Sequence, residues 1–318
     1  MMPTSIPIAR LHFHFIAETP IKLPDWPASM VRGAFGHALR RLSCMTRQRE
    51  CGDCPLSRTC PYPAIFAPPP LEHRIQRFAQ PPVPYLIAPE SRGPRLLEKG
   101  EPLCFGMTLM GRALREMPLV VEAMKLAARR GLGAGGGTAE LGEVALSPCA
   151  EESVAETLYR PAEDKRLRDL PLPVLTVSPP PPALDRLTLR FHTPLRLQNN
   201  GHALAPAKLT AAALLTTTVK RVALLAELYG NGVPAWDFKA LARQAAEIAD
   251  EKSLRWQDWS RYSSRQDQVM RLGGVLGTWR LSGNLAAFFP ALFMGQWLGT
   301  GKETVFGLGR YRLLYDAS

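Results

Sequence analysis

The sequence predicts an α+β protein built from two tandem ferredoxin-like domains, each with the element order β-α-β-β-α-β. Two observations support this fold class. Strand-like alternation and helix-like periodicity follow one another in that order in both halves of the chain. Four consecutive prolines lie between the halves, and such a run fits an extended linker because proline is excluded from helix interiors and central strands. We therefore expect domains at residues 1–176 and 184–318, joined by a linker at residues 177–183.

The first domain begins with a predicted half-buried strand. Residues 8–17 alternate apolar side chains with polar ones, among them His12 and His14. Residues 27–42 place apolar side chains on one helical stripe and begin with a proline suited to a first turn, so they predict a helix. The remaining elements expected in this domain are a strand at residues 102–111, a helix at residues 117–131 and a strand at residues 139–147.

A proline-rich insertion is expected between the first helix and the second predicted strand, at about residues 44–103. It contains four cysteines with the spacing C-x6-C-x2-C-x5-C. In a cytoplasmic protein such a cluster indicates a metal site rather than disulfides. We expect a structural zinc ion with four protein ligands, and an iron–sulfur cluster or free thiols are the alternatives. The candidate ligands are Cys44, Cys51, Cys54 and Cys60.

The second domain repeats the plan. Residues 184–197 alternate as a strand, and residues 205–230 form a long predicted helix that ends at a glycine. A shorter helical stretch at residues 237–251 comes before the next strands. The other expected elements are a hairpin of residues 254–263 and 266–281, a helix at residues 284–299 and a strand at residues 309–315.

Charge and the first residues restrict the class of protein. Lys and Arg number 39 against 28 Asp and Glu, a net charge of +11, which favours a polyanionic partner such as nucleic acid. No apolar run approaches the ~18 residues of a membrane span, and the N-terminal residues lack the pattern of a secretory signal. We therefore expect a cytoplasmic protein with no membrane partner.

The stretch GTGKETVFGLG, residues 299–309, carries the most specific motif. It is not a P-loop, because both the glycine spacing and the residue after the lysine differ from that motif. Together with RYSSRQDQVMRLGGVLGTWRLSG and HTPLRLQ, it resembles the C-terminal domain of the CRISPR precursor-RNA processing endoribonucleases of the RAMP superfamily. VRGAFGHALRRL and CGDCPLSRTCPYPAIF in the first domain are similar to a subset of that family.

The resemblance implies RRM-like domains that bind CRISPR repeat RNA and cut it without a catalytic metal. The nucleophile would be the 2′-hydroxyl of the RNA, and the product a 2′,3′-cyclic phosphate. It also implies a catalytic histidine on the first helix, and His37 is the matching residue, with Arg40 and Arg41 following it. The alternative for His37 is a surface histidine on a basic helix face.

Candidate RNA contacts lie in the second domain. The glycines permit unusual backbone angles and could turn N–H groups toward phosphates, while the basic side chains add charge. Tyr262 and Arg265 could stack on a base and bind a phosphate. The alternatives are a tight turn packed on the sheet and a polar strand edge. The loop candidates are Gly299, Gly301, Lys302, Gly307, Gly309 and Arg310.

Three functions stay open at this stage. The first is an endoribonuclease that cuts the repeats of a precursor transcript and serves other CRISPR effector subunits. The second is a RAMP subunit that holds guide RNA without cutting it. The third is a metal-thiolate regulatory or redox module built on the cysteines.

Overall fold

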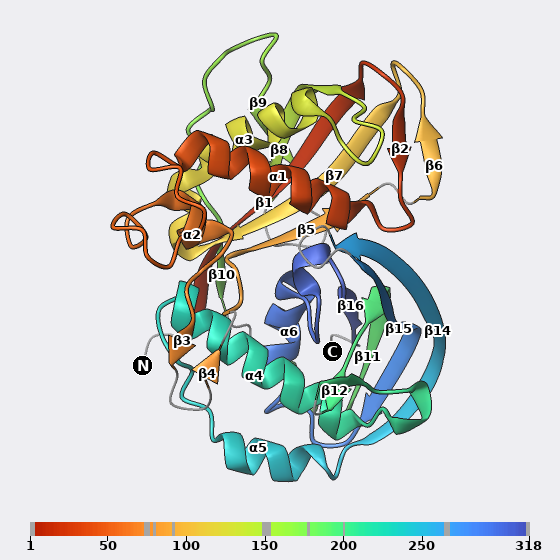
Figure 1. The fold of residues 1–318 in the computed structure, drawn as a ribbon. Helices are drawn as coiled ribbons and strands as arrows, with labels where there is room; N and C mark the ends of the chain where they lie inside the picture. Colours follow the sequence, from red (N-terminus) through yellow and green to blue (C-terminus); the bar gives the residue numbers. More distant parts are fainter. Residues whose placement is uncertain are drawn as a thin grey trace. The chain divides into compact units, whose positions relative to one another are not determined.

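A computed structural model describes residues 4–72, 77–78, 81–90, 93–147, 154–176, 179–199, 201–263 and 268–315 (Figure 1). The chain divides into two compact units. We call Pro7–Pro173 the N-terminal unit, and Val174–Ser318 with Met1–Ile6 the C-terminal unit. Each has a ferredoxin-like sheet with helices on one face, so the predicted fold class is confirmed.

The sheet of the N-terminal unit has the path β5-β7-β1-β8-β9 and is antiparallel along that path. The strands β1 and β7 lie between β5 and β8, which is the split β-α-β arrangement of a ferredoxin-like domain. The strands of this path are β1 (Ser5–Ala17), β5 (Tyr85–Pro89), β7 (Pro102–Met110), β8 (Ala139–Ser147) and β9 (Glu156–Tyr159). The short strand β10 (Val174–Thr176) lies at the start of the C-terminal unit.

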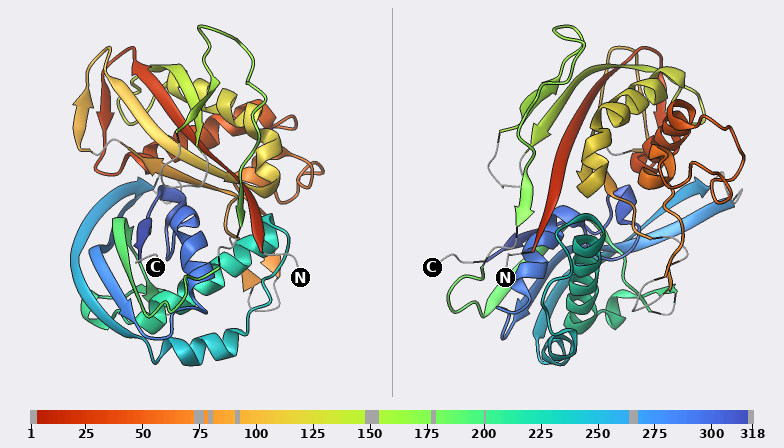
Figure 2. Two further views of the ribbon diagram at one scale, coloured as in Figure 1. Left: turned by 180° about the vertical axis from the view of Figure 1, so that it is seen from behind. Right: turned by 90° about the vertical axis from the view of Figure 1, so that its left-hand side faces the viewer.

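Two helices, α1 (Pro27–Ser43) and α3 (Met117–Arg130), pack against each other on one face of this sheet (Figure 2). The alternation of β1 explains which face they cover, because Leu11, Phe13 and Phe15 are buried and His14 is exposed. The rings of Phe13 and Phe15 stack with Phe105 of β7 at centroid distances of 5.3 and 5.6 Å. The apolar side of the sheet therefore forms the core of the unit.

The insertion predicted at residues 44–103 is not separate from the sheet, because it contains the edge strand β5. Only five residues form β5, and its first three side chains are all buried, so it lacks the alternation that marks a half-buried strand. The segment also forms α2 (Pro61–Ile65), the pair β3 (Leu71–Glu72) and β4 (Arg77–Phe78), and β6 (Arg95–Leu97), which pairs with β2 (Ile21–Leu23).

The sheet of the C-terminal unit has the order β14-β15-β11-β16 and is antiparallel throughout. Again the first and third strands of the motif, β11 and β15, lie at the centre. The strands are β11 (Arg186–Leu195), β14 (Ala249–Ser263), β15 (Gln268–Ser282) and β16 (Tyr311–Leu314), and the helices are α4 (Ala211–Tyr229), α5 (Phe238–Ala245) and α6 (Phe289–Leu298). Short elements complete it: β12 (Gln198–Asn199), β13 (His202–Ala203), η2 (Pro206–Lys208) and η3 (Thr304–Phe306).

The helices α4 and α6 begin later than predicted, at Ala211 and Phe289, and a third boundary in this unit also differs. The helical stretch expected to reach residue 251 ends at Ala245, and the strand β14 begins at Ala249. The side chain of Asp250 explains the early strand, because its Oδ2 accepts a hydrogen bond from Trp279 Nε1 at 2.6 Å on the neighbouring strand. A contact across the sheet therefore sets this boundary.

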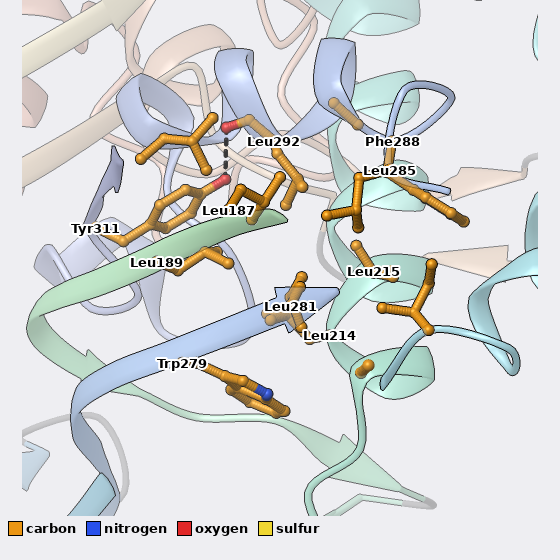
Figure 3. Close-up of a cluster of buried hydrophobic side chains, with 14 of the residues drawn as sticks. Leu187, Leu189, Leu214, Leu215, Trp279, Leu281, Leu285, Phe288, Leu292 and Tyr311 are labelled. Carbon is orange, nitrogen blue, oxygen red and sulfur yellow. Dashed lines mark hydrogen bonds between the residues drawn. The ribbon is translucent and has the colours of Figure 1, made fainter. Parts of the chain in front are cut away.

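The core of the C-terminal unit lies between its sheet and the helices α4 and α6 (Figure 3). Leu189 and Leu281 of the sheet face Leu214 of α4, and all three are fully buried. The hydroxyl of Tyr311 on β16 donates to the carbonyl oxygen of Leu292 on α6 at 2.7 Å, and burial raises the pKa of Tyr311. This bond fixes α6 and the last strand on either side of the glycine loop.

Candidate functional site

A groove runs beside the exposed side of α1. His37 and Arg41 line a cavity of about 410 Å³, together with Arg130 and Gly131 at the end of α3. The buried stripe of α1 turns these two side chains outward, because Val31, Phe35, Ala38 and Leu39 face the core. His37 and Arg41 are four residues apart and therefore lie on the same side of the helix. Arg130 was missed by sequence reasoning, since nothing in its own segment relates it to α1.

This groove combines a side chain that can transfer protons with two fixed positive charges. Histidine is the residue type most often used for proton transfer near neutral pH. The guanidinium groups of Arg41 and Arg130 can pair with a phosphate, and arginine does so through two parallel hydrogen bonds. The arrangement is suited to a phosphodiester.

Arg40 is directed elsewhere. Its Nη2 donates to the carbonyl oxygens of Gln48 at 2.5 Å and Arg49 at 2.7 Å, and its guanidinium carbon lies 5.7 Å from the ring centroid of Tyr62. On a helix, residues three and four positions after His37 lie on opposite sides of it, about 60° and 40° away. Arg41 consequently shares the groove with His37, while Arg40 holds the loop that follows α1.

The glycine loop joins α6 to β16, and its glycines are required by backbone geometry. Gly299, Gly301, Gly307 and Gly309 all have positive φ, between 66° and 81°. A Cβ on Gly301 would lie 2.5 Å from the carbonyl oxygen of Arg196, and one on Gly309 would clash with the carbonyl oxygen of Thr300. The loop therefore packs too closely against its surroundings to accept side chains at these positions.

Several backbone N–H groups of the loop are used inside the protein. Thr300 N–H donates to the carbonyl oxygen of Gly309 at 3.0 Å, Lys302 N–H to that of Arg196 at 2.9 Å, and Gly309 N–H to that of Pro194 at 3.0 Å. These three groups hold the loop on the sheet, so they do not turn toward a ligand as the sequence led us to expect. The side chain of Lys302 is exposed, and that of Arg310 is half-buried.

Two residues of α4, Thr218 and Arg221, form hydrogen bonds with the glycine loop, and sequence reasoning missed both. The hydroxyl groups of Thr218 and Thr300 are hydrogen-bonded at 2.7 Å in a buried position. Arg221 donates from Nε to the carbonyl oxygen of Gly299 at 3.0 Å and from Nη2 to that of Leu298 at 3.1 Å. Desolvation lowers the pKa of Arg221 to about 10.

Comparison with known families bears on both units. Residues 6–172 match the N-terminal domain family AF_1859_N, and residues 189–311 match the family described as CRISPR-associated endoribonuclease Cas6. The second match spans β11 to the start of β16 and includes the glycine loop. Residues 189–311 therefore resemble the CRISPR-associated endoribonucleases of the RAMP type.

Solved structures of Cas6 proteins share the fold. A product complex of Cas6 (TTHB231) aligns with a TM-score of 0.56 at 16% identity, covering 97% of this chain and 99% of that one. Thermus thermophilus Cas6 (TTHB231) gives 0.52 at 16% identity, with the same coverage. A partial Cas6-RT-Cas1–Cas2 complex gives 0.58 at 13% identity and covers 99% of this chain but 47% of that one. No curated protein matches the chain.

Two RNA candidates of the sequence remain, Tyr262 of β14 and Arg265. Tyr262 is paired with Val269 near the end of β14. Arg265 lies outside the described residues.

The structure gives no support for a metal site at the four clustered cysteines. Cys44, Cys51, Cys54 and Cys60 are half-buried free thiols that line one cavity of about 190 Å³. Within the described residues, no group of three or more His, Cys, Asp or Glu side chains could hold a metal ion. Two of the sulfur atoms are within hydrogen-bonding distance of other groups. Cys54 Sγ lies 3.4 Å from Thr46 Oγ1, and Cys60 Sγ lies 3.9 Å from the carbonyl oxygen of Ser43. The expected zinc ion, and the iron–sulfur alternative, are unsupported.

The two histidines of β1 lie apart from the groove on α1, on the sheet face that carries polar side chains. His12 Nδ1 lies 2.8 Å from Glu90 Oε1, and His14 Nδ1 lies 3.3 Å from Cys104 Sγ. Each imidazole therefore already has a neighbour in the same unit. None of the helices in the described part of the chain has the length and apolar character needed to cross a bilayer.

Proposed function

We propose that this chain binds CRISPR repeat RNA in precursor transcripts and cleaves it to give guide RNAs, without a catalytic metal. The observation that carries the proposal is the groove that His37, Arg41 and Arg130 line together. The match of residues 189–311 to the Cas6 family supports an RNA-cleaving enzyme, and the net charge of +11 fits a polyanionic substrate. The site of action would be the cytoplasm, where such transcripts are made.

The proposed reaction uses the nucleophile that RNA carries. The 2′-oxygen attacks the adjacent phosphorus, the bond from phosphorus to the 5′-oxygen breaks, and a 2′,3′-cyclic phosphate and a 5′-hydroxyl result. His37 takes the proton from the 2′-hydroxyl, and the departing 5′-oxygen takes a proton from water. Arg41 and Arg130 neutralise the charge that develops on the phosphoryl oxygens, and the groove holds the reacting atoms in line.

The glycine loop would bind RNA outside the reacting phosphate. Lys302 presents an exposed ammonium group, and Arg310 adds a second cation at the other end of the loop. The N–H groups of Thr300, Lys302 and Gly309 form hydrogen bonds inside the protein. We therefore assign phosphate binding to the side chains of Lys302 and Arg310. Tyr262 and Arg265 would add contacts from the β14–β15 hairpin.

The proposed partners follow from the same comparisons. Similar structures include a product complex of Cas6 and an assembly of Cas6 with RT, Cas1 and Cas2. We therefore propose repeat RNA as the substrate, and other CRISPR subunits as proteins that this chain serves.

The deciding experiment incubates the whole protein with its host's repeat RNA in EDTA. We expect one cut per repeat, a cyclic phosphate at the new 3′ end, and no cut when a single 2′-deoxy nucleotide precedes the scissile phosphate. Cleavage of the deoxy RNA would refute the internal nucleophile. Tight binding with no cleavage, with or without added metal, would instead favour a RAMP subunit that only holds guide RNA.

Arg40 and Arg41 provide a matched pair of variants for the site itself. Arg41→Ala should slow the single-turnover rate, because its side chain lines the groove. Arg40→Ala should lower the thermal stability and spare the rate, because its guanidinium binds loop carbonyl oxygens. If Arg40→Ala slows the rate and Arg41→Ala does not, the reacting phosphate binds on the side of α1 that carries Arg40.

A further inference from the structure

An exposed tryptophan is held rigidly on the β14–β15 hairpin of the C-terminal unit. Trp256 is 37% exposed, and its indole Nε1 donates to Oδ1 of Asp258 at 2.8 Å. The ring also lies against Gly273 of the paired strand, since a Cβ on Gly273 would clash with its six-membered ring. The hydrogen bond and the glycine together fix the plane of the indole while part of its surface stays open to solvent.

The same glycine connects the tryptophan to the glycine loop. The carbonyl oxygen of Gly273 accepts a hydrogen bond from Arg196 Nη1 at 2.9 Å. The carbonyl oxygen of Arg196 in turn accepts the N–H of Lys302 at 2.9 Å. Arg196 thereby links Gly273, against which the indole lies, to the backbone of Lys302, whose side chain is exposed.

The surroundings of the ring favour a nucleobase as its occupant. Arg255 precedes Trp256 and is exposed, and the carboxylate of Asp258 already accepts the indole N–H. An indole held in a fixed plane offers a face on which an unpaired base of single-stranded RNA can stack. A protein partner would be expected to cover a contiguous apolar patch. Here the residues around Trp256 in β14 are Arg255, Gln257 and Asp258.

We propose that Trp256 is a stacking platform for one unpaired base of the bound RNA, and that Lys302 binds the backbone of the same single-stranded segment. This inference rests on the proposed function, because it assumes that repeat RNA is the ligand. It adds a positioning residue that fixes which nucleotide lies beside the glycine loop. Stacking tolerates any base, so the platform would set the register of the strand rather than its sequence.

The test combines variants of Trp256 with an abasic scan of the RNA. Uncleavable repeat RNA, with a 2′-deoxy nucleotide at the cut, is prepared with a single abasic site at each position in turn. The parent protein should lose roughly 5- to 100-fold in affinity at one position. Trp256→Leu should lose the same factor with intact RNA and show no further loss at that position, whereas Trp256→Phe should behave like the parent.

The leucine and phenylalanine variants are matched because both cover Gly273 with an apolar side chain, and only phenylalanine retains an aromatic face. A loss of affinity spread equally over all abasic positions, or equal affinity in Trp256→Leu and the parent, would overturn the platform. If the parent protein binds no repeat RNA at all, the proposed function fails with it. If Trp256→Leu binds RNA normally but loses a protein subunit from the assembly, the platform serves a protein partner and the proposal is wrong.

Discussion

The guanidinium of Arg221 donates a hydrogen bond from Nε to the carbonyl oxygen of Gly299 at 3.0 Å, and a second from Nη2 to that of Leu298 at 3.1 Å. One side chain of α4 therefore fixes both the end of α6 and the beginning of the glycine loop. Hydrogen bonds from charged groups contribute more to stability than neutral ones. The support of the loop is consequently a property that can be measured in the absence of RNA.

Arg221→Met should destabilise the fold by about 1.5–3 kcal/mol, because the carbonyl oxygens of Leu298 and Gly299 lose their charged donor. The measurement is the free energy of unfolding in urea. Lys220→Met is the matched control, since Lys220 is the exposed neighbour on the same helix. Equal losses in the two variants would show that Arg221 does not support the loop.

Gly309→Ala should destabilise the protein far more than Gly201→Ala. Both glycines have positive φ, 68° and 82°, so both substitutions introduce backbone strain of about 1–3 kcal/mol. Only at Gly309 would the new Cβ also clash, with the carbonyl oxygen of Thr300, whereas nothing lies within 4 Å at Gly201. Thermal unfolding of the two variants should differ by several degrees, and similar melting temperatures would contradict the packing of the loop.

His37→Ala should lower the single-turnover cleavage rate by roughly 10²- to 10⁴-fold, because general acid–base catalysis contributes about that factor. Affinity for the repeat and folding should change little, since the side chain is exposed. His202→Ala, which removes an exposed histidine of β13, is the control and should cut at the parent rate. If His37→Ala cleaves at the parent rate, His37 is not the proton-transfer residue, although attack by the 2′-hydroxyl would still stand.

Lys302→Ala should weaken repeat binding more than it slows cleavage at saturating protein, because we propose that the loop binds phosphates away from the reacting bond. The log-log dependence of affinity on salt should also become shallower by about 0.7 for each phosphate of single-stranded RNA that the variant no longer neutralises. Lys239→Ala, an exposed lysine of α5, is the control. An unchanged salt slope in Lys302→Ala would remove the proposed phosphate contact.

Glu143 should make the N-terminal unit more stable at neutral than at acid pH. Its pKa is lowered by a hydrogen bond from Thr157 Oγ1 at 2.5 Å, against an opposing effect of burial, and further by Arg160 at 2.8 Å. Because the folded-state pKa lies below the unfolded value of 4.5, this stabilisation is present above that pH and is lost as the pH falls through the folded-state pKa. Urea titrations should show that Glu143→Gln destabilises the protein at pH 7 and has a smaller effect at pH 3.

Local patterns in the sequence determined the elements whose burial follows a simple period. The alternation of β1 predicted which side chains of that strand are buried, and the apolar stripe of α1 predicted that His37 is exposed. The glycine spacing predicted a loop between the last helix and the last strand. Each of these features depends on residues within a few positions of one another, so it can be inferred from the chain alone.

Tertiary structure alone decided the features that depend on distant partners. The strand β5 has no alternation of its own and is defined by its pairing with β7, and Asp250 lies in a strand because it bonds Trp279. Arg130 lines the groove of His37 because α1 packs against α3, although 92 residues lie between His37 and Arg130 in the sequence. Spacing along the chain likewise does not specify which N–H groups of the glycine loop form hydrogen bonds inside the protein. Nor does it specify how the four thiols are arranged. A one-dimensional pattern reports which face of an element is buried, whereas the side chain that it meets is fixed only when the elements pack.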